Sequence, residues 1–183
     1  TALSLQAHRL AQSEMSAEAH TRLNTLQQGI ERGRKLLDQL LTLARSQDQT
    51  HQATQQLSVR SVYRHVLEEL MPLAEAKHID LGRLDGADAH ITVNELEATT
   101  VIKNLVDNAI RYSPNGSQID LSVHTHANQV VLAVEDNGAG IAPEERTRVL
   151  DPFYRIAGSE QTGSGLGLSI VKTIVERWGG TIS

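Results

Sequence analysis

The chain has 183 residues, of which 39% are hydrophobic, so it can form one or two domains with apolar cores. A net charge of −5 and an aromatic content of 3% argue against a sequence-independent nucleic-acid surface and against base-stacking platforms. The absence of Cys excludes disulfides and thiolate metal sites and fits a reducing compartment, and the sequence shows neither a signal peptide nor an apolar run long enough to span a membrane.

The first 46 residues predict two helices. Residues 2–14 carry apolar side chains at helical spacing, and a polar break near Ser16 precedes a second helix. The second helix has a heptad seam made of Leu23, Leu26, Ile30, Gly33, Leu37, Leu40 and Ala44. Additional leucines widen this seam, as a four-helix core requires. We therefore predict a hairpin over 1–46 that dimerises; the alternative is a hairpin packed on the chain's own globular domain.

A polar linker is predicted over 47–56, followed by a globular domain over 57–183. Short strands are predicted near residues 57–59, 79–81, 91–93, 119–123 and 130–134. Helices are predicted from an apolar face running from Val62 to Leu73, over 94–112, and over 166–178. The fold class is therefore α+β: a helical hairpin, then an α/β sandwich with a mixed, mostly antiparallel sheet and helices on one face.

The helix over 94–112 contains Asn104 and Asn108, four residues apart and hence on one face. An amide oxygen is a neutral, hard ligand, and Mg2+ that keeps most of its waters needs only one or two such contacts besides phosphate oxygens. Taken alone, the pair is equally a polar patch near the end of an amphipathic helix.

Two glycine motifs follow. Asp136, Gly138 and Gly140 come after a predicted strand, where a carboxylate can accept a hydrogen from an exocyclic purine amine and glycine lets the backbone approach the ring. The run 163–168, Gly-Ser-Gly-Leu-Gly-Leu, opens the last helix, whose free N–H groups suit a triphosphate, although the G-K-[ST] of a P-loop is absent. The connection of about 22 residues between the motifs is typical of a lid.

The order Asn-x-x-x-Asn, Asp-x-Gly-x-Gly, Phe-Tyr-Arg, Gly-x-Gly-Leu-Gly-Leu resembles the ATP-binding domain of sensor histidine kinases, the Bergerat (GHKL, HATPase_c) fold. The hairpin resembles their HisKA-type dimerisation and histidine-phosphotransfer domain. In detail the chain resembles PmrB/QseC-type membrane-bound kinases paired with OmpR-type response regulators. The resemblance implies ATP and Mg2+ as cofactors, a homodimer, a response-regulator receiver domain as partner, no nucleic acid, and the cytoplasmic portion of an inner-membrane protein.

The resemblance also implies roles for single residues. Asn108 would bind Mg2+, with Asn104 near the phosphates, and Asp136 would bind the adenine amine. Tyr112 would pack against the base, and Arg111 would reach the phosphates. For Tyr112 the alternative is ordinary core packing, and for Arg111 it is a solvated surface charge.

Further roles are implied along the lid. Phe153 would anchor the lid in the core, and Arg155 would stabilise charge on the transferring phosphoryl group; their alternatives are again core packing and a solvated charge. The remaining positions implied to line the nucleotide or hinge the lid are Gly138, Gly140, Ile141, Gly163, Gly165, Leu166, Gly167 and Leu168.

The sequence departs from the family pattern at its beginning and end. The H-E-x-x-[TN]-P stretch with the phosphoacceptor His is absent, and His8, followed by Arg9, lacks that motif. Thr1-Ala2-Leu3 looks like the residues just downstream of it, so residues 1–46 are expected to be truncated before the acceptor, and the chain is expected not to phosphorylate itself. The end at Ser183 reads as the start of a strand, so the domain is expected to lack its last strands.

The implied reaction is phosphoryl transfer from ATP to a histidine nitrogen and then to an Asp of a response regulator, in two-component signal transduction. Two alternatives stay open at this point. One is an ATPase of the gyrase, Hsp90 and MutL kind, which has a Glu where Asn104 stands; an Asn cannot take a proton from water at neutral pH. The other is a catalytically silent, nucleotide-binding dimeric scaffold.

Overall fold

The computed structural model describes residues 10–11, 16, 18–27, 29–30, 33, 53–127, 129–156 and 163–183. The chain divides into two compact units, residues 1–47 and 48–183. In the first unit residues 18–27 and 29–30 are helical, as predicted. Leu23 is buried there, whereas Leu26 is 55% exposed. Leu37, Leu40, Ala44 and His8 lie outside the described residues, and the predicted domain boundaries stay predictions.

The second unit contains two small sheets. Strand β1 (Gln55–Ser58) pairs antiparallel with β3 (His90–Val93). Strand β4 (Gln118–His126) lies between β2 (Asp80–Asp85), to which it is parallel, and β5 (Gln129–Asp136), to which it is antiparallel. The described strands thus form a mixed, mostly antiparallel set, in which β4 and β5 are a hairpin, and this confirms the predicted fold class.

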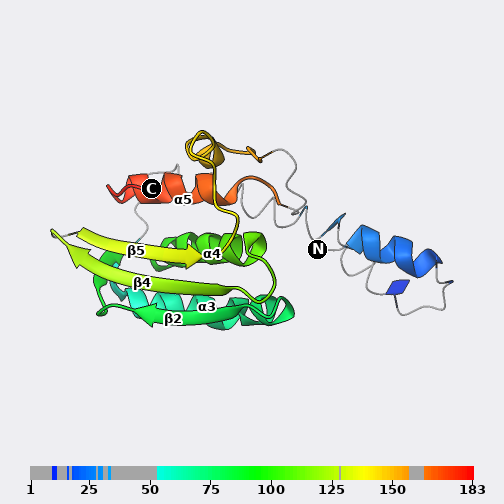
Figure 1. Ribbon diagram of the computed structural model, residues 1–183, viewed down its shortest axis with the longest axis horizontal. Coiled ribbons are helices and arrows are strands. Elements are labelled where there is room, and N and C mark those ends of the chain that lie inside the picture. The colour runs from blue at the N-terminus through cyan, green and yellow to red at the C-terminus, as the bar shows by residue number, and fades with distance from the viewer. Residues whose placement is uncertain are drawn as a thin grey trace. The chain divides into compact units, whose positions relative to one another are not determined.

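Two helices cover one face of the three-stranded sheet (Figure 1). They are α3 (Val59–Ala76) and α4 (Glu95–Tyr112). Strand β4 alternates, so that Ile119, Leu121 and Val123 are fully buried in the core with the apolar faces of both helices. In the described part of the chain no helix is long and apolar enough to cross a membrane.

One predicted core position in α3 was wrong. Leu73 is 49% exposed, whereas Leu70 and Ala74 are buried. Positions 70 and 74 are four residues apart and share a helix face, while position 73 is rotated by about 100° from its neighbour at 74. The core-facing stripe of the last turn therefore passes through Ala74.

Both ends of α4 are capped. At the start, the Asn94 side chain accepts a hydrogen bond from the Glu97 N–H at 3.2 Å. At the end, Lys77 Nζ donates to the carbonyl oxygens of Ile110, Arg111 and Ser113 at 2.8, 3.0 and 2.9 Å. A cation on carbonyls of the last helical turn suits the negative end of the helix dipole. Lys77 thus stabilises the C-terminal end of α4, the helix that contains Asn104 and Asn108.

Candidate functional site

The first part of the site lies between α4 and the start of α5 (Gly167–Arg177). The Asn104 side chain is half-buried, and its Nδ2 donates to the Thr100 carbonyl at 2.8 Å. A Cβ on Gly167 would stand 3.1 Å from Asn104 Oδ1, so the third glycine of the motif lies directly against this amide oxygen. Asn108, one turn further along α4, is also half-buried.

The second part lies at the end of α4. Arg111 Nη2 pairs with Asp107 Oδ2 at 2.7 Å, and both side chains are partly exposed. A Cβ on Gly163 would stand 3.8 Å from Arg111 Nη1, so the first glycine of the motif also lies beside α4. The Tyr112 side chain is 41% exposed. A cation thus lies next to the glycine motif, and the aromatic residue that follows it in the sequence is exposed.

The third part is the turn after β5. Asp136 is the last residue of β5, and its Oδ1 accepts a hydrogen bond from the Gly138 N–H at 2.7 Å. A Cβ on Gly138 would stand only 2.6 Å from that oxygen and 3.1 Å from the Tyr112 carbonyl oxygen. Any side chain at position 138 would therefore displace the Asp136 carboxylate or the end of α4. Gly138 thus lies against both the Asp136 carboxylate and the Tyr112 carbonyl oxygen.

The connection after β5 returns to α5 through one close backbone contact. The Phe153 N–H donates to the Gly165 carbonyl oxygen at 2.9 Å. Gly165 has φ +73°, and a Cβ there would stand 2.7 Å from the Phe153 carbonyl carbon and 2.8 Å from the Tyr154 carbonyl oxygen. Both the positive φ and the contact require glycine. The middle of the predicted lid, residues 157–162, lies outside the described residues.

A small polar cluster stabilises the first half of this connection. The Tyr154 hydroxyl is hydrogen-bonded to the Glu145 carboxylate, and the Arg148 guanidinium lies 4.4 Å from the Tyr154 ring centroid. The bond to Glu145 raises the pKa of Tyr154. Arg148 belongs to the short 3-10 helix η1 (Arg148–Leu150). The segment therefore has local order of its own next to α5.

The prediction that Phe153 anchors the lid in the core was wrong. Its side chain is 59% exposed and its φ is +66°. The physical reason is that the backbone of residues 153 and 154, and not the ring, occupies the space beside Gly165. Residue 153 is held by its backbone, and the ring is left on the surface.

The other predicted positions divide by exposure. Arg155 and Gly140 are exposed, Ile141 is 37% exposed, and Leu168 is half-buried. Leu166 is fully buried, so its side chain packs beneath the glycine motif and only its backbone remains for a bound group. The roles of these positions at a nucleotide stay predictions.

Sequence reasoning missed several residues around the site. The Asp107–Arg111 pair has the i,i+4 spacing of a helical ion pair and could have been found from that signal. Lys77 contacts the end of α4, and Glu145 contacts the Tyr154 hydroxyl. These residues are far apart in the sequence from the groups they contact or have no periodic relation to them, so short-range patterns could not predict the contacts.

The three parts together form a site that fits a nucleoside triphosphate and a hard cation. Gly138 and Gly167 each leave space that a Cβ would fill, one beside a carboxylate and the other beside an amide oxygen. The donor set comprises two amides, one guanidinium and one carboxylate, which suits phosphate, Mg2+ and a purine amine. In the described residues no three acidic or histidine side chains cluster as an all-protein metal site would need.

The comparisons with known proteins agree with this fit. Residues 93–183 match the family described as "Histidine kinase-, DNA gyrase B-, and HSP90-like ATPase". The chain is 39% identical over 163 residues to the sensor protein QseC of Salmonella typhi, which covers 88% of this chain and 35% of that protein. It is 37% identical over 183 residues to the sensor protein kinase PmrB of Pseudomonas aeruginosa, covering 98% and 38%.

A solved structure is also similar. The cytoplasmic segment of histidine kinase QseC matches with a TM-score of 0.54 at 27% identity, covering 84% of this chain and 83% of that one. The present chain spans a little over a third of the length of the two curated relatives.

Proposed function

We propose that this chain, which belongs through residues 93–183 to the family of histidine kinase-, DNA gyrase B- and HSP90-like ATPases, is the cytoplasmic core of a sensor histidine kinase. Its reaction is the ATP-dependent phosphorylation of a histidine in a dimerisation domain. The phosphoryl group then passes to an Asp of a response regulator. The similarity to proteins named sensor protein and sensor protein kinase supports this proposal.

One observation favours a kinase over a hydrolase. The group that faces the glycine motif is the amide of Asn104, whose Nδ2 is already bonded to the Thr100 carbonyl. An amide cannot take a proton from an attacking water at neutral pH. A histidine nucleophile needs no such base, because neutral imidazole already carries a lone pair on nitrogen. The site is therefore equipped to position and to neutralise charge, which is most of what phosphoryl transfer requires.

Different residues bind different parts of the nucleotide. Asp136 accepts a hydrogen bond from the adenine amine, with Tyr112 against the base. Arg111 and the N–H groups of the glycine motif bind phosphate oxygens, and Arg155 acts on the transferring group. Asn108, with Asn104 near the phosphates, would hold Mg2+, which when bound supplies charge neutralisation at the phosphates.

The proposal extends to assembly and partners. Leu26 presents an exposed apolar side chain on a helix with a heptad seam, which supports a homodimer through the hairpin. The resemblance to PmrB/QseC-type kinases supports an OmpR-type receiver domain as the phosphoryl acceptor. It also supports a membrane anchor in the full-length protein, whose cytoplasmic portion this chain would be.

A phosphotransfer assay tests the proposal. The chain is incubated with γ-labelled ATP, Mg2+ and a separate helical hairpin that carries an H-E-x-x-[TN]-P segment. We expect acid-labile, base-stable label on the hairpin, as a phosphohistidine gives. Steady release of phosphate without label would instead indicate an ATPase, and ADP binding without either would indicate a silent scaffold.

A further inference from the structure

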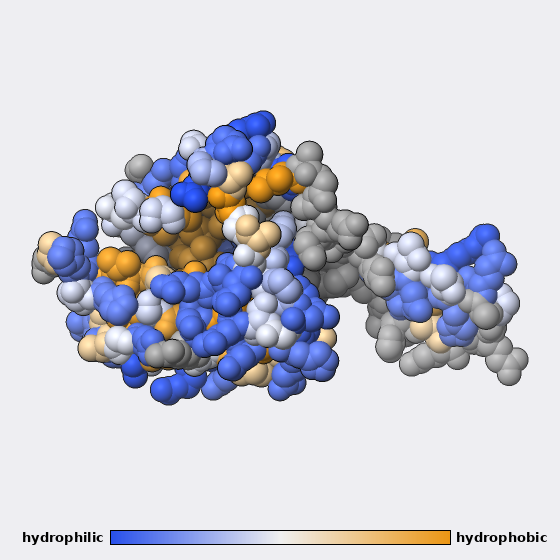
Figure 2. Space-filling model, in the orientation of Figure 1, coloured by the Kyte–Doolittle hydropathy of each residue, from blue (hydrophilic) through white to orange (hydrophobic). Residues whose placement is uncertain are grey.

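Helix α5 carries the glycine motif at its start, yet it is held differently from the other helices. The main core cluster is built from α3, α4 and the sheets, and it contains none of the described residues of α5 itself. Helix α5 packs on α4 and touches η1. In Figure 2, hydrophobic residues are visible at the surface between the positions of α5 and β5. Ile170, Val171 and Ile174 of α5 are buried in this packing, and further contacts at the two ends of the helix add to it.

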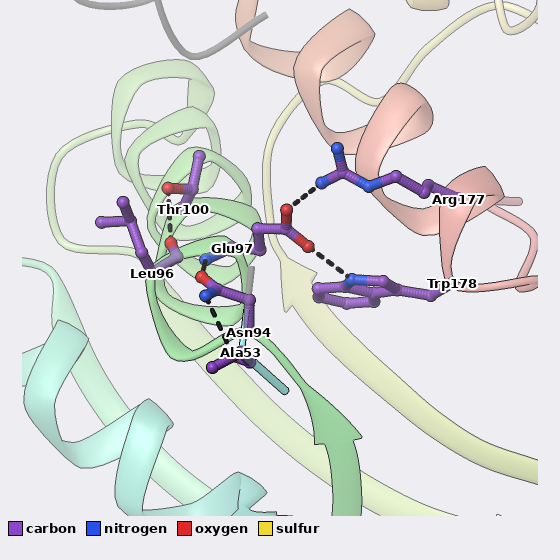
Figure 3. A network of polar contacts seen from close by, with 7 residues as sticks. All are labelled: Ala53, Asn94, Leu96, Glu97, Thr100, Arg177 and Trp178. Atoms are coloured by element: carbon purple, nitrogen blue, oxygen red, sulfur yellow. Dashed lines mark hydrogen bonds and ion pairs between the residues drawn. The ribbon is translucent and has the colours of Figure 1, made fainter. Parts of the chain in front are cut away.

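One of these contacts is a polar clasp at the far end of α5, defined here as Glu97, Arg177 and Trp178 (Figure 3). Glu97 Oε2 accepts a hydrogen bond from Trp178 Nε1 at 2.9 Å, and Glu97 Oε1 pairs with Arg177 Nη2. The Glu97 side chain is only 14% exposed. Trp178 also packs against the main core cluster. Both carboxylate oxygens of one residue on α4 are thus used to hold the end of α5.

The position of Glu97 is itself fixed by hydrogen bonds at the start of α4. It lies in the first turn of α4, where its N–H donates to the side chain of Asn94. Asn94 in turn donates from Nδ2 to the Ala53 carbonyl at 3.3 Å. A Glu three residues after the cap usually reaches back to the cap's own N–H. Here its carboxylate contacts the neighbouring helix instead.

We infer that Glu97 is a positioning residue for the nucleotide site, and this rests on the proposed function. Helix α5 packs on α4 through its buried apolar side chains, and both of its ends also contact α4: its first residue, Gly167, lies against Asn104, and its end is clasped by Glu97. Glu97 and Asn104 lie about 10 Å apart along the axis of α4. Because a helix is stiff over this length, the clasp sets how the glycine motif faces Asn104, without any contact of Glu97 with the nucleotide.

The test compares Glu97→Ala with Glu69→Ala in the whole chain, using ADP with Mg2+ as the probe. Glu69 forms an ion pair with Lys103 between α3 and α4, so its variant also removes an interhelical pair but leaves α5 untouched. We expect Glu97→Ala to weaken ADP binding by at least about fivefold, the lower end of usual coupling between sites. Glu97→Gln, which keeps one neutral acceptor, should lose less, and Glu69→Ala should bind like the unmodified chain.

A second readout separates positioning from plain stability. Trp178 is the single Trp of the chain, so the tryptophan fluorescence comes from a residue of the clasp. Coupling is reciprocal, and ADP should therefore change the Trp178 emission in the unmodified chain and in Glu69→Ala, but not in Glu97→Ala. If Glu97→Ala does not fold, Arg177→Gln removes the ion pair while leaving the indole in place, and the same weakening and loss of response are expected.

The outcomes are distinguishable. A lower melting temperature with unchanged ADP affinity and an unchanged Trp178 response in Glu97→Ala would overturn the positioning role, leaving the clasp as a stability element. Failure of the unmodified chain to bind ADP would overturn the proposed function itself.

Discussion

Gly167 lies so close to Asn104 that a methyl group at position 167 would stand 3.1 Å from the side-chain oxygen of that Asn. This distance is shorter than ordinary van der Waals contact, so the Asn104 amide would have to shift by a few tenths of an ångström. The relation joins two motifs more than sixty positions apart in the sequence.

Gly167→Ala should therefore impair binding more than folding. Gly167 is the first residue of α5, where Ala is a better helix former than Gly. We expect ADP affinity to fall by about tenfold, or about 1.4 kcal/mol, with little loss of melting temperature. Gly180→Ala is the matched control, because its Cβ would stand equally close, 3.1 Å, to Val175 Cγ1. Calorimetry showing equal ADP affinity in both variants would contradict the assignment.

Asp136→Asn should remove the preference for adenine while preserving the turn. The Asn side chain keeps an oxygen for the Gly138 N–H, but its amide nitrogen cannot accept a hydrogen bond from the base. We expect ADP binding to weaken by about 1.5–3 kcal/mol, the range for a hydrogen bond to a charged group. Inosine diphosphate, which lacks the amine, should bind about equally to both forms. The neighbouring Glu135→Gln serves as control, and a full adenine preference in Asp136→Asn would refute the contact.

Lys77→Met should destabilise the fold through α4. Its ammonium donates to three carbonyl oxygens at the end of that helix, and Met keeps the length but has no donor. We expect the free energy of unfolding to fall by roughly 1–3 kcal/mol in urea titrations, because the oxygens lose their partners. Lys103→Met removes a half-exposed ion pair with Glu69 and should change it by less than about 1 kcal/mol. Equal effects of the two substitutions would argue against the cap.

Patterns of short range predicted most of the fold. The strands β4 and β5 and the helix α4 each follow from neighbouring residues, and each was predicted to within a few residues of its observed bounds. The one error among the helical positions, Leu73, came from extending an apolar stripe by one residue into the last turn.

Contacts between distant elements could not be predicted in the same way. The hydrogen bond between Glu97 and Trp178 could not be predicted from neighbouring residues, because the sheet and the packing of α5 on α4 determine which side chains come into contact. Phe153 is the converse case. The resemblance implied that Phe153 anchors the lid in the core, but the backbone contact at Gly165 determines its position and leaves the ring exposed.

Leu26→Asp should convert the proposed dimer into a monomer. Leu26 is 55% exposed on its helix and belongs to the heptad seam, so an Asp there would carry an uncompensated charge into the interface between two hairpins. We expect light scattering to give the mass of a dimer for the unmodified chain and of a monomer for the variant. Asn24→Asp, on an exposed position outside the seam, should stay dimeric. A monomeric unmodified chain across a wide concentration range would favour a hairpin that packs on its own chain.

Asn108→Ala should abolish phosphoryl transfer. The sequence contains no H-E-x-x-[TN]-P segment, so the chain alone should take no acid-labile label from γ-labelled ATP. A separate hairpin with that segment should become labelled slowly, since the effective concentration given by a tether is lost. Asn108→Ala should stop this labelling because the amide that would hold Mg2+ is removed, whereas Asn115→Ala, in the exposed turn after α4, should leave the rate unchanged. Two results would overturn this account: label on the chain alone would make His8 or another histidine the acceptor, and full labelling of the hairpin by the Asn108 variant would remove the metal role from that residue.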